Sequence, residues 1–98
     1  MIHFGLALGL LLALSGAAEA GERGLASYYA GTAPGQMTCA HRTRPFGTIV
    51  KVIHGDRSIR CRVTDRGPFK RGRIIDVSVS AAKALGMIGA GIIAVTLE

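Results

Sequence analysis

The pattern of apolar and polar positions after residue 20 is typical of short β-strands. In segment 57–65, Ile59, Cys61 and Val63 alternate with polar residues, and this period of two indicates a half-buried strand. Segment 48–53 is rich in β-branched residues, which favour strands. The other predicted strands cover residues 25–29, 74–77 and 92–97. Residues 37–44 stay ambiguous, so we expect five or six strands.

One helix is predicted between the last two strands. Ser78 or Ser80 can accept a hydrogen bond at its N-terminus, the alanines of segment 81–85 favour helix, and Gly86 ends it. The rest of the chain offers no long crossover helix. We therefore expect a mainly β fold, a small closed or nearly closed barrel with one short helix, because closure removes exposed sheet edges.

The first twenty residues are typical of an export signal. Residues 4–14 are apolar or glycine, a run too short for the roughly 20 residues that span a bilayer. The segment 18–20 reads Ala-Glu-Ala, a small-x-small cleavage site. We predict a signal peptide at 1–20 and one domain at 21–98, periplasmic or secreted and without a membrane span when mature. The alternative is an uncleaved N-terminal anchor.

Cys39 and Cys61 are the only cysteines. In an exported protein, such a pair favours a disulfide, which would stabilise so small a domain by roughly 3 kcal/mol. Two buried free thiols are the alternative. The three histidines are scattered and there is no CxxC spacing, so we expect no metal and no cofactor.

The domain is strongly basic. All 12 Lys and Arg residues follow residue 20, whereas only 6 acids occur in the whole chain. Such a surface favours polyanions, and an anionic wall polymer suits an exported chain better than a nucleic acid. Strand parity places Arg60 and Arg62 toward solvent. These charges could also do no more than keep the domain soluble.

Two aspartates could carry chemistry. By parity Asp65 shares the buried face of its strand, and burial raises the pKa of a carboxyl group toward the range that proton transfer needs. Arg66, Arg73 or the Gly67 amide could pair with it, and it could equally cap a turn. Asp76 lies among β-branched residues and is a second candidate acid, a satisfied structural group or a helix cap.

His41 follows Cys39 closely, so a disulfide would tether it near the strand that ends at Asp65. A surface histidine without a role is the alternative.

Four blocks of the sequence resemble the rare lipoprotein A (RlpA) family. Residues 24–29 (GLASYY) are similar to its GxASWYG motif, and residues 38–48 (TCAHRTRPFGT) to its TAAHKTLPFGT segment. Residues 63–69 (VTDRGPF) resemble its INDRGPF motif, and residues 72–78 (GRIIDVS) its GRIIDLS motif. The blocks run in order through nearly all of segment 24–97.

This resemblance implies a six-stranded double-psi β-barrel and an endolytic peptidoglycan transglycosylase. Such a lyase cleaves between N-acetylmuramic acid and N-acetylglucosamine, in some members on peptide-stripped strands, and leaves 1,6-anhydro ends. Asp65, Asp76 and His41 match the family's functional positions, so they are the expected catalytic residues. We expect the substrate to contact Tyr28, Tyr29, Arg66 and Arg73, and the protein to act as a monomer on glycan strands.

The chain departs from the family at residues 33–37 (APGQM). There the family normally carries a longer TANGExFD insert, whose Glu is a proposed catalytic acid. Two alternatives therefore stand beside the enzyme: a non-catalytic, expansin-like peptidoglycan-binding module, and an interaction domain that recruits other wall proteins.

Overall fold

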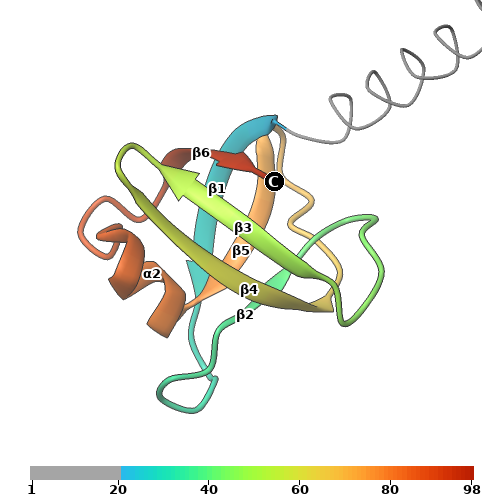
Figure 1. Cartoon of the computed structure of the whole chain (residues 1–98), viewed down its shortest axis with the longest axis horizontal. Coiled ribbons are helices and arrows are strands. Elements are labelled where there is room, and N and C mark those ends of the chain that lie inside the picture. Colours follow the sequence, from blue (N-terminus) through green and yellow to red (C-terminus); the bar gives the residue numbers. More distant parts are fainter. Residues whose placement is uncertain (1–20) are drawn as a thin grey trace, which may run out of the picture.

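A computed structural model describes residues 21–98 (Figure 1). The export-signal prediction concerns residues 1–20, which lie outside this described segment. The chain forms six strands and one helix: β1 (Glu22–Tyr29), β2 (Thr38–Ala40), β3 (Ile49–His54), β4 (Arg57–Asp65), β5 (Arg73–Ser78), α2 (Val79–Leu85) and β6 (Ile93–Leu97). The ambiguous segment 37–44 contributes the very short β2, and the other predicted strands are confirmed with small shifts at their ends.

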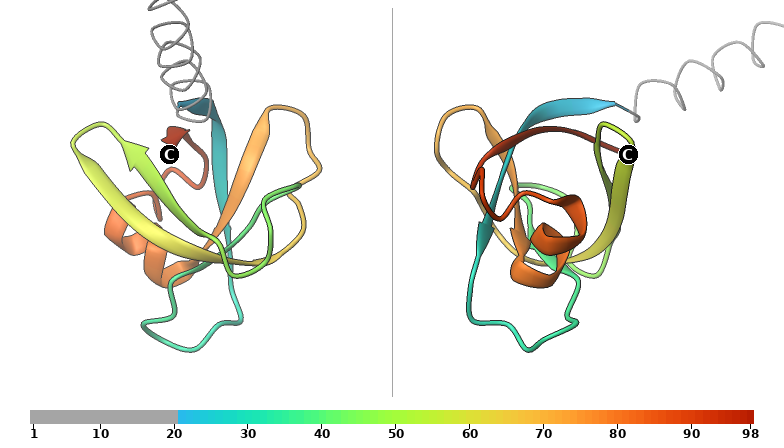
Figure 2. Two further views of the ribbon diagram at one scale, coloured as in Figure 1. Left: turned by 45° about the vertical axis from the view of Figure 1, so that its right-hand side comes forward. Right: turned by 90° about the vertical axis from the view of Figure 1, so that its left-hand side faces the viewer.

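The strands close into one barrel in the order β1-β5-β2-β4-β3-β6. The pairs β1–β5 and β2–β4 are parallel, and the remaining pairs are antiparallel. Figure 2 shows the strands wrapping around a common interior, with the loop 30–37 projecting from one end. The predicted closed barrel is therefore confirmed, and every strand edge within residues 21–98 has a partner.

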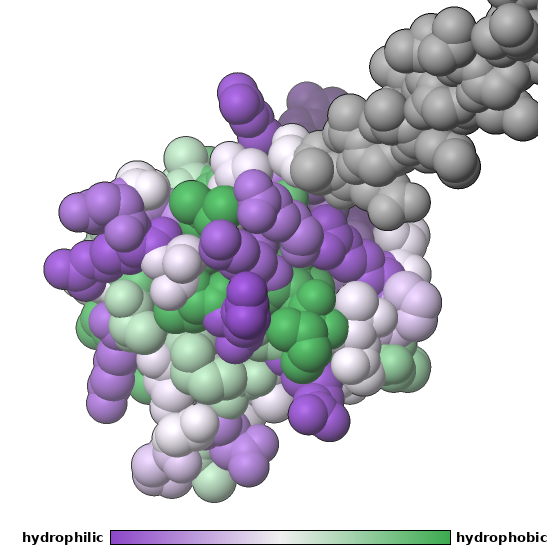
Figure 3. Space-filling model, viewed as in Figure 1, coloured by the Kyte–Doolittle hydropathy of each residue, from purple (hydrophilic) through white to green (hydrophobic). Residues whose placement is uncertain are grey.

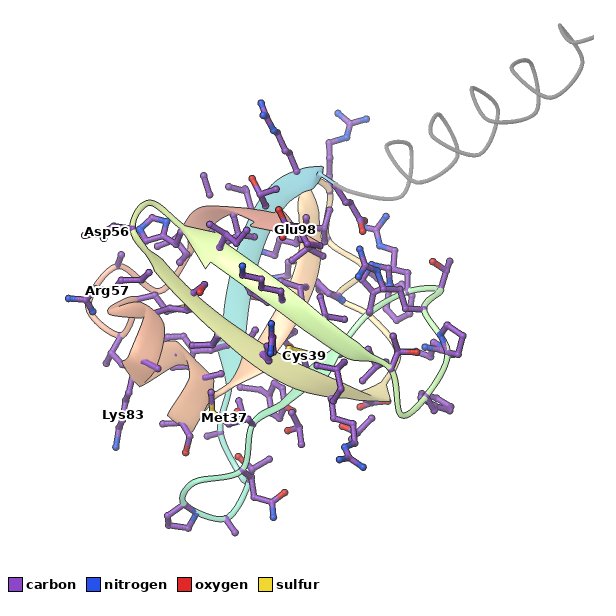
Figure 4. The ribbon with its side chains drawn as sticks, in the orientation of Figure 1. Met37, Cys39, Asp56, Arg57, Lys83 and Glu98 are labelled. Atoms are coloured by element: carbon purple, nitrogen blue, oxygen red, sulfur yellow. A yellow bond between two sulfur atoms is a disulfide. The ribbon has the colours of Figure 1, made fainter. Side chains whose placement is uncertain are left out.

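The interior is filled by the alternate apolar positions of the strands. Ile59, Cys61 and Val63 are buried as the period of two predicts, whereas Arg60 and Arg62 are exposed. Figure 3 shows hydrophilic side chains gathered over the outer faces of β3 and β4. The predicted disulfide forms between Cys39 and Cys61, and Figure 4 places Cys39 behind these two strands, inside the barrel.

Helix α2 begins and ends as its sequence predicts. Ser78 caps its N-terminus by accepting a hydrogen bond from the Ala81 amide, and Gly86 adopts a left-handed conformation (φ 71°) at its C-terminus. Ala81, Ala82 and Leu85 are buried against the barrel. Asp76 takes no part in this cap, so that alternative for the residue is wrong and its carboxyl group has another environment.

Candidate functional site

Asp65 and Asp76 lie in one row across four neighbouring strands. The register pairs Asp65 of β4 with Ala40 of β2, Ala40 with Asp76 of β5, and Asp76 with Ser27 of β1. Strands in a sheet are about 4.8 Å apart, so the two aspartate Cα atoms are about 10 Å apart with a methyl group between them. The barrel therefore brings together two carboxyl groups that are eleven positions apart in the sequence.

Asp65 is exposed, so the prediction that it lies on the buried face is wrong. The pairing of β2 with β4 shifts register between Cys39 and Ala40, and this shift inserts Thr64 as an extra residue. A bulge breaks the alternation of faces, so Thr64 and Asp65 both point outward after the buried Val63. The extra residue thus directs Asp65 out of the core and onto the same surface as Asp76.

The carboxyl group of Asp65 accepts a hydrogen bond of 2.8 Å from the Arg66 backbone amide. The sequence suggested the neighbouring Gly67 amide or an arginine side chain instead. Within residues 21–98, no ion pair forms at Asp65 or Asp76. The backbone of the turn that follows β4 therefore orients the Asp65 carboxyl group, which remains exposed to solvent.

Asp76 is half-buried, and burial raises the pKa of its carboxyl group. The Ser27 hydroxyl donates to its Oδ1 at 3.1 Å and, like the positive charge of Arg73, opposes this rise, whereas the negative charge of Asp65 adds to it. The half-burial expected of a proton-donating Asp65 is thus found at Asp76, which lies inside β5 and not at its end. A carboxyl group with a raised pKa is suited to donate a proton.

Both carboxyl groups line a cleft of about 510 Å³, here called the carboxylate cleft. Its walls come from β1, β2, β4, β5 and the loop 30–37. The lining residues are Tyr29, Thr32, Gln36, Thr38, Ala40, Thr64, Asp65, Arg66 and Asp76. An adjoining groove of about 440 Å³ shares Gln36, Thr38 and Thr64 with the cleft and extends it to Arg62. The two hollows therefore adjoin one another along β2 and β4.

The four residues expected to contact substrate divide into two pairs. Tyr29 lines the carboxylate cleft, with its hydroxyl 2.6 Å from the Thr38 Oγ1, and Arg66 lines the cleft beside Asp65. Tyr28 lies on the other face of β1 and donates a hydrogen bond to the Ile88 carbonyl. Arg73 is half-buried and does not line the cleft, but its charge acts on Asp76.

His41 is buried, with 4% of its surface exposed, so the alternative of a surface histidine is wrong. Its Nδ1 accepts hydrogen bonds from the amides of Thr43 and Arg44, so its Nε2 carries the hydrogen and donates to Glu22 at 3.1 Å. The ring does not line the carboxylate cleft. His41 thus organises the loop after β2, and its backbone carbonyl accepts from Arg66.

Sequence reasoning missed six residues of this site: Ser27, Thr32, Gln36, Thr38, Ala40 and Thr64. The only signal for Ser27 was its shared strand face with Tyr29. Ala40 and Thr64 become relevant through the register of β2, a strand of three residues that no periodicity could reveal.

A third hollow lies where β6 meets β1 and β3, and we call it the β6 hollow. It encloses about 570 Å³ and is lined by Arg23, Gly24, Leu25, Ile53, Gly55, Ala94, Val95 and Thr96. It contains no carboxyl group and only one charged side chain. Within residues 21–98, no group of histidine, cysteine or acidic side chains could hold a metal ion. No helix of that segment has both the length and the apolar character needed to cross a membrane.

The closed barrel and its aspartate motifs match a known family. Residues 21–97 match the model of the double-psi β-barrel family described as "Lytic transglycolase". The chain belongs to this family, so the family resemblance and the double-psi fold predicted from the sequence are confirmed.

Named relatives share the domain but are longer proteins. The "Probable endolytic peptidoglycan transglycosylase RlpA" of Nostoc sp. is 54% identical over 67 residues, covering 66% of this chain and 18% of the relative. The "Endolytic peptidoglycan transglycosylase RlpA" of Haemophilus influenzae is 41% identical over 91 residues, covering 79% of this chain and 32% of the relative. The chain therefore spans about a fifth to a third of the length of these two relatives.

Solved structures of similar fold come from other proteins. An expansin of Clavibacter michiganensis, solved without ligand, superposes with a TM-score of 0.67 at 22% identity, covering 80% of this chain and 49% of the expansin. The Streptomyces papain inhibitor superposes with a TM-score of 0.63 at 22% identity, covering 80% of this chain and 92% of the inhibitor. At this identity the similarity establishes the fold alone.

Proposed function

We propose that the protein is an endolytic peptidoglycan transglycosylase that acts on glycan strands outside the cytoplasm. The observation that carries the proposal is the half-buried Asp76, with its raised pKa, facing an open cleft that also holds the exposed Asp65. The names of the relatives support the same reaction. The disulfide fits an oxidising compartment, where wall polymer is the available glycan.

Asp76 is the proposed general acid. It donates its proton to the oxygen that joins N-acetylmuramic acid to N-acetylglucosamine as the bond from C1 to that oxygen breaks. The C6 hydroxyl of the muramic residue then attacks C1, and the Asp76 carboxylate accepts the proton that this hydroxyl loses. The products are a 1,6-anhydro end and a free sugar hydroxyl, and no water is consumed.

Asp65 is the proposed electrostatic partner. Cleavage of a glycosidic bond develops positive charge on the sugar ring, and a carboxylate on the same face stabilises it. Because Ala40 separates the two aspartates, a sugar ring can approach both of them. His41 is a proposed positioning residue, since it fixes the loop whose carbonyl groups hold Arg66 beside Asp65.

The test is to incubate the purified protein with peptide-free glycan strands and identify the products by mass spectrometry. We expect 1,6-anhydro ends from the unmodified protein and a loss of rate of about 10²–10⁴-fold in Asp76→Asn, which keeps the shape but cannot donate the proton. Asp56→Asn, in the β3–β4 turn, is the matched control and should keep the full rate. Full turnover in Asp76→Asn would refute the assignment.

A glycan-binding module without catalysis is the second candidate. The loop 30–37 carries no acid, so Asp65 and Asp76 are the only carboxyl groups that line the cleft. A mutant of the expansin of similar fold has also been crystallised in complex with cellohexaose. This candidate predicts that insoluble peptidoglycan retains the protein, that salt weakens the retention, and that no anhydro product appears.

A further inference from the structure

Two phenylalanines remain exposed on two loops joined by Arg66, a residue that lines the carboxylate cleft. Phe69 exposes 78% of its surface and Phe46 exposes 62%, the largest values among the large apolar residues of segment 21–98. They lie on loops 66–72 and 41–48, which run side by side in Figure 1, one light orange and one green. Exposed aromatic rings gain nothing from the core, so rings held in this position indicate a surface that binds something.

The first link between the two loops comes from Arg42. Its guanidinium donates hydrogen bonds to the carbonyl oxygens of Pro68 at 2.8 Å, Lys70 at 3.2 Å and Arg73 at 3.0 Å. Three carbonyl groups around one planar donor fix the path of loop 66–72. Phe69 is therefore carried by a braced loop, although its own ring is exposed.

The second link runs in the opposite direction. The Nη1 of Arg66 donates to the carbonyl oxygens of His41 at 3.1 Å and Arg44 at 2.8 Å, which holds the loop that carries Phe46. The guanidinium also stacks over the Phe46 ring, with its carbon 4.0 Å from the ring centre. Each loop thus sends one arginine into the backbone of the other, and both rings are held on a single rigid unit.

This unit is continuous with the carboxylate cleft. Arg66 lines the cleft next to Asp65 and stacks on Phe46. Phe69 packs over the next residue, Gly67, where a Cβ atom would lie 3.4 Å from the ring. Neither phenylalanine lines the cleft itself, and Arg66 links the loops that carry them to it.

We propose that Phe46 and Phe69 form an aromatic platform on which a sugar ring of the glycan strand stacks. This sugar is at least one sugar unit away from the glycosidic bond that is cleaved beside the two carboxyl groups. One face of a pyranose ring carries axial C–H groups, which are attracted to the electron-rich face of an aromatic ring. Within residues 21–98, the Nε and Nη2 of Arg66 have no protein acceptor, so they are available to sugar hydroxyls. This inference rests on the proposed function for its substrate class.

The test measures the binding of peptide-free glycan strands by calorimetry, with one set of long strands and one set of single disaccharides. Phe69→Ala and Phe46→Ala should each weaken binding of the long strands by about three- to tenfold and leave disaccharide binding unchanged. Phe69→Tyr keeps a stacking ring and should bind normally. Ile92→Ala, which removes an apolar side chain of 41% exposure away from the cleft, is the matched control.

The outcomes separate this inference from the proposed function. Weaker binding of long strands by the alanine variants, in a protein that releases no anhydro product, supports the platform and refutes the enzyme. Unchanged binding of long strands by both folded variants overturns the platform, even if the unmodified protein releases anhydro ends. If the alanine variants lose as much affinity for disaccharides as for long strands, the platform is also overturned.

Discussion

The carboxylate cleft and the β6 hollow enclose similar volumes, about 510 and 570 Å³, on one small barrel. They differ in what surrounds the space. The cleft is lined by two carboxyl groups and an arginine. It is also lined by β2, a strand of three residues that a disulfide links to β4. The β6 hollow lies among longer strands and has Arg23 as its only charge. Volume alone therefore does not distinguish the candidate site from the β6 hollow, whereas the placement of titratable groups does.

The largest expected effect concerns the disulfide under the cleft. Replacing both cysteines with alanine should lower the free energy of unfolding by about 3 kcal/mol, because the bond closes a loop of 22 residues in the unfolded chain. Urea unfolding measures this loss. Hydrogen exchange should then accelerate more at the β2 amides than at those of β6. Equal acceleration in both strands would remove this difference between the two regions.

The second prediction fills each hollow in turn. Ala40→Leu places a larger side chain between Asp65 and Asp76 and should lower the rate of anhydro-end formation by about tenfold or more, since small displacements of reacting groups are costly. Ala94→Leu makes the same change in the β6 hollow, where it should leave the rate unchanged. Thermal unfolding checks that both variants fold. If Ala94→Leu lowers the rate as much, the β6 hollow takes part in the reaction.

The smallest expected effect is the pH dependence of stability at Asp76. Because burial raises the pKa of Asp76, the folded protein binds this proton more tightly than the unfolded chain, and stability falls as pH rises from the ordinary pKa to the raised one. Asp76→Asn should therefore gain stability relative to the unmodified protein at neutral pH. The gain should vanish below the ordinary pKa. Urea unfolding at several pH values measures it, and Asp56→Asn should show no such trend.

The sequence was sufficient for the barrel but only partly for its site. The period of two in segment 57–65 and the caps of α2 depend on local chemistry, so they were predictable. The facing of Asp65 depends on a register shift against β2, which is a non-local property. The raised pKa of Asp76 likewise depends on its burial in the assembled barrel, where its hydrogen-bond partner Ser27 is 49 positions away. Local patterns therefore identified the two acids, misassigned the environment of Asp65 and left that of Asp76 open.

The extra residue at Thr64 makes this surface sensitive to the register in which β4 pairs with β2. A β4 of unchanged sequence but without the bulge would alternate regularly and turn Asp65 into the apolar interior. A chain that lacked Thr64 would instead place this aspartate directly after the buried Val63, facing outward again. A one-residue slip in the pairing of β4 with β2, and not the loss of the extra residue itself, is thus the change that would remove the second carboxylate from this surface.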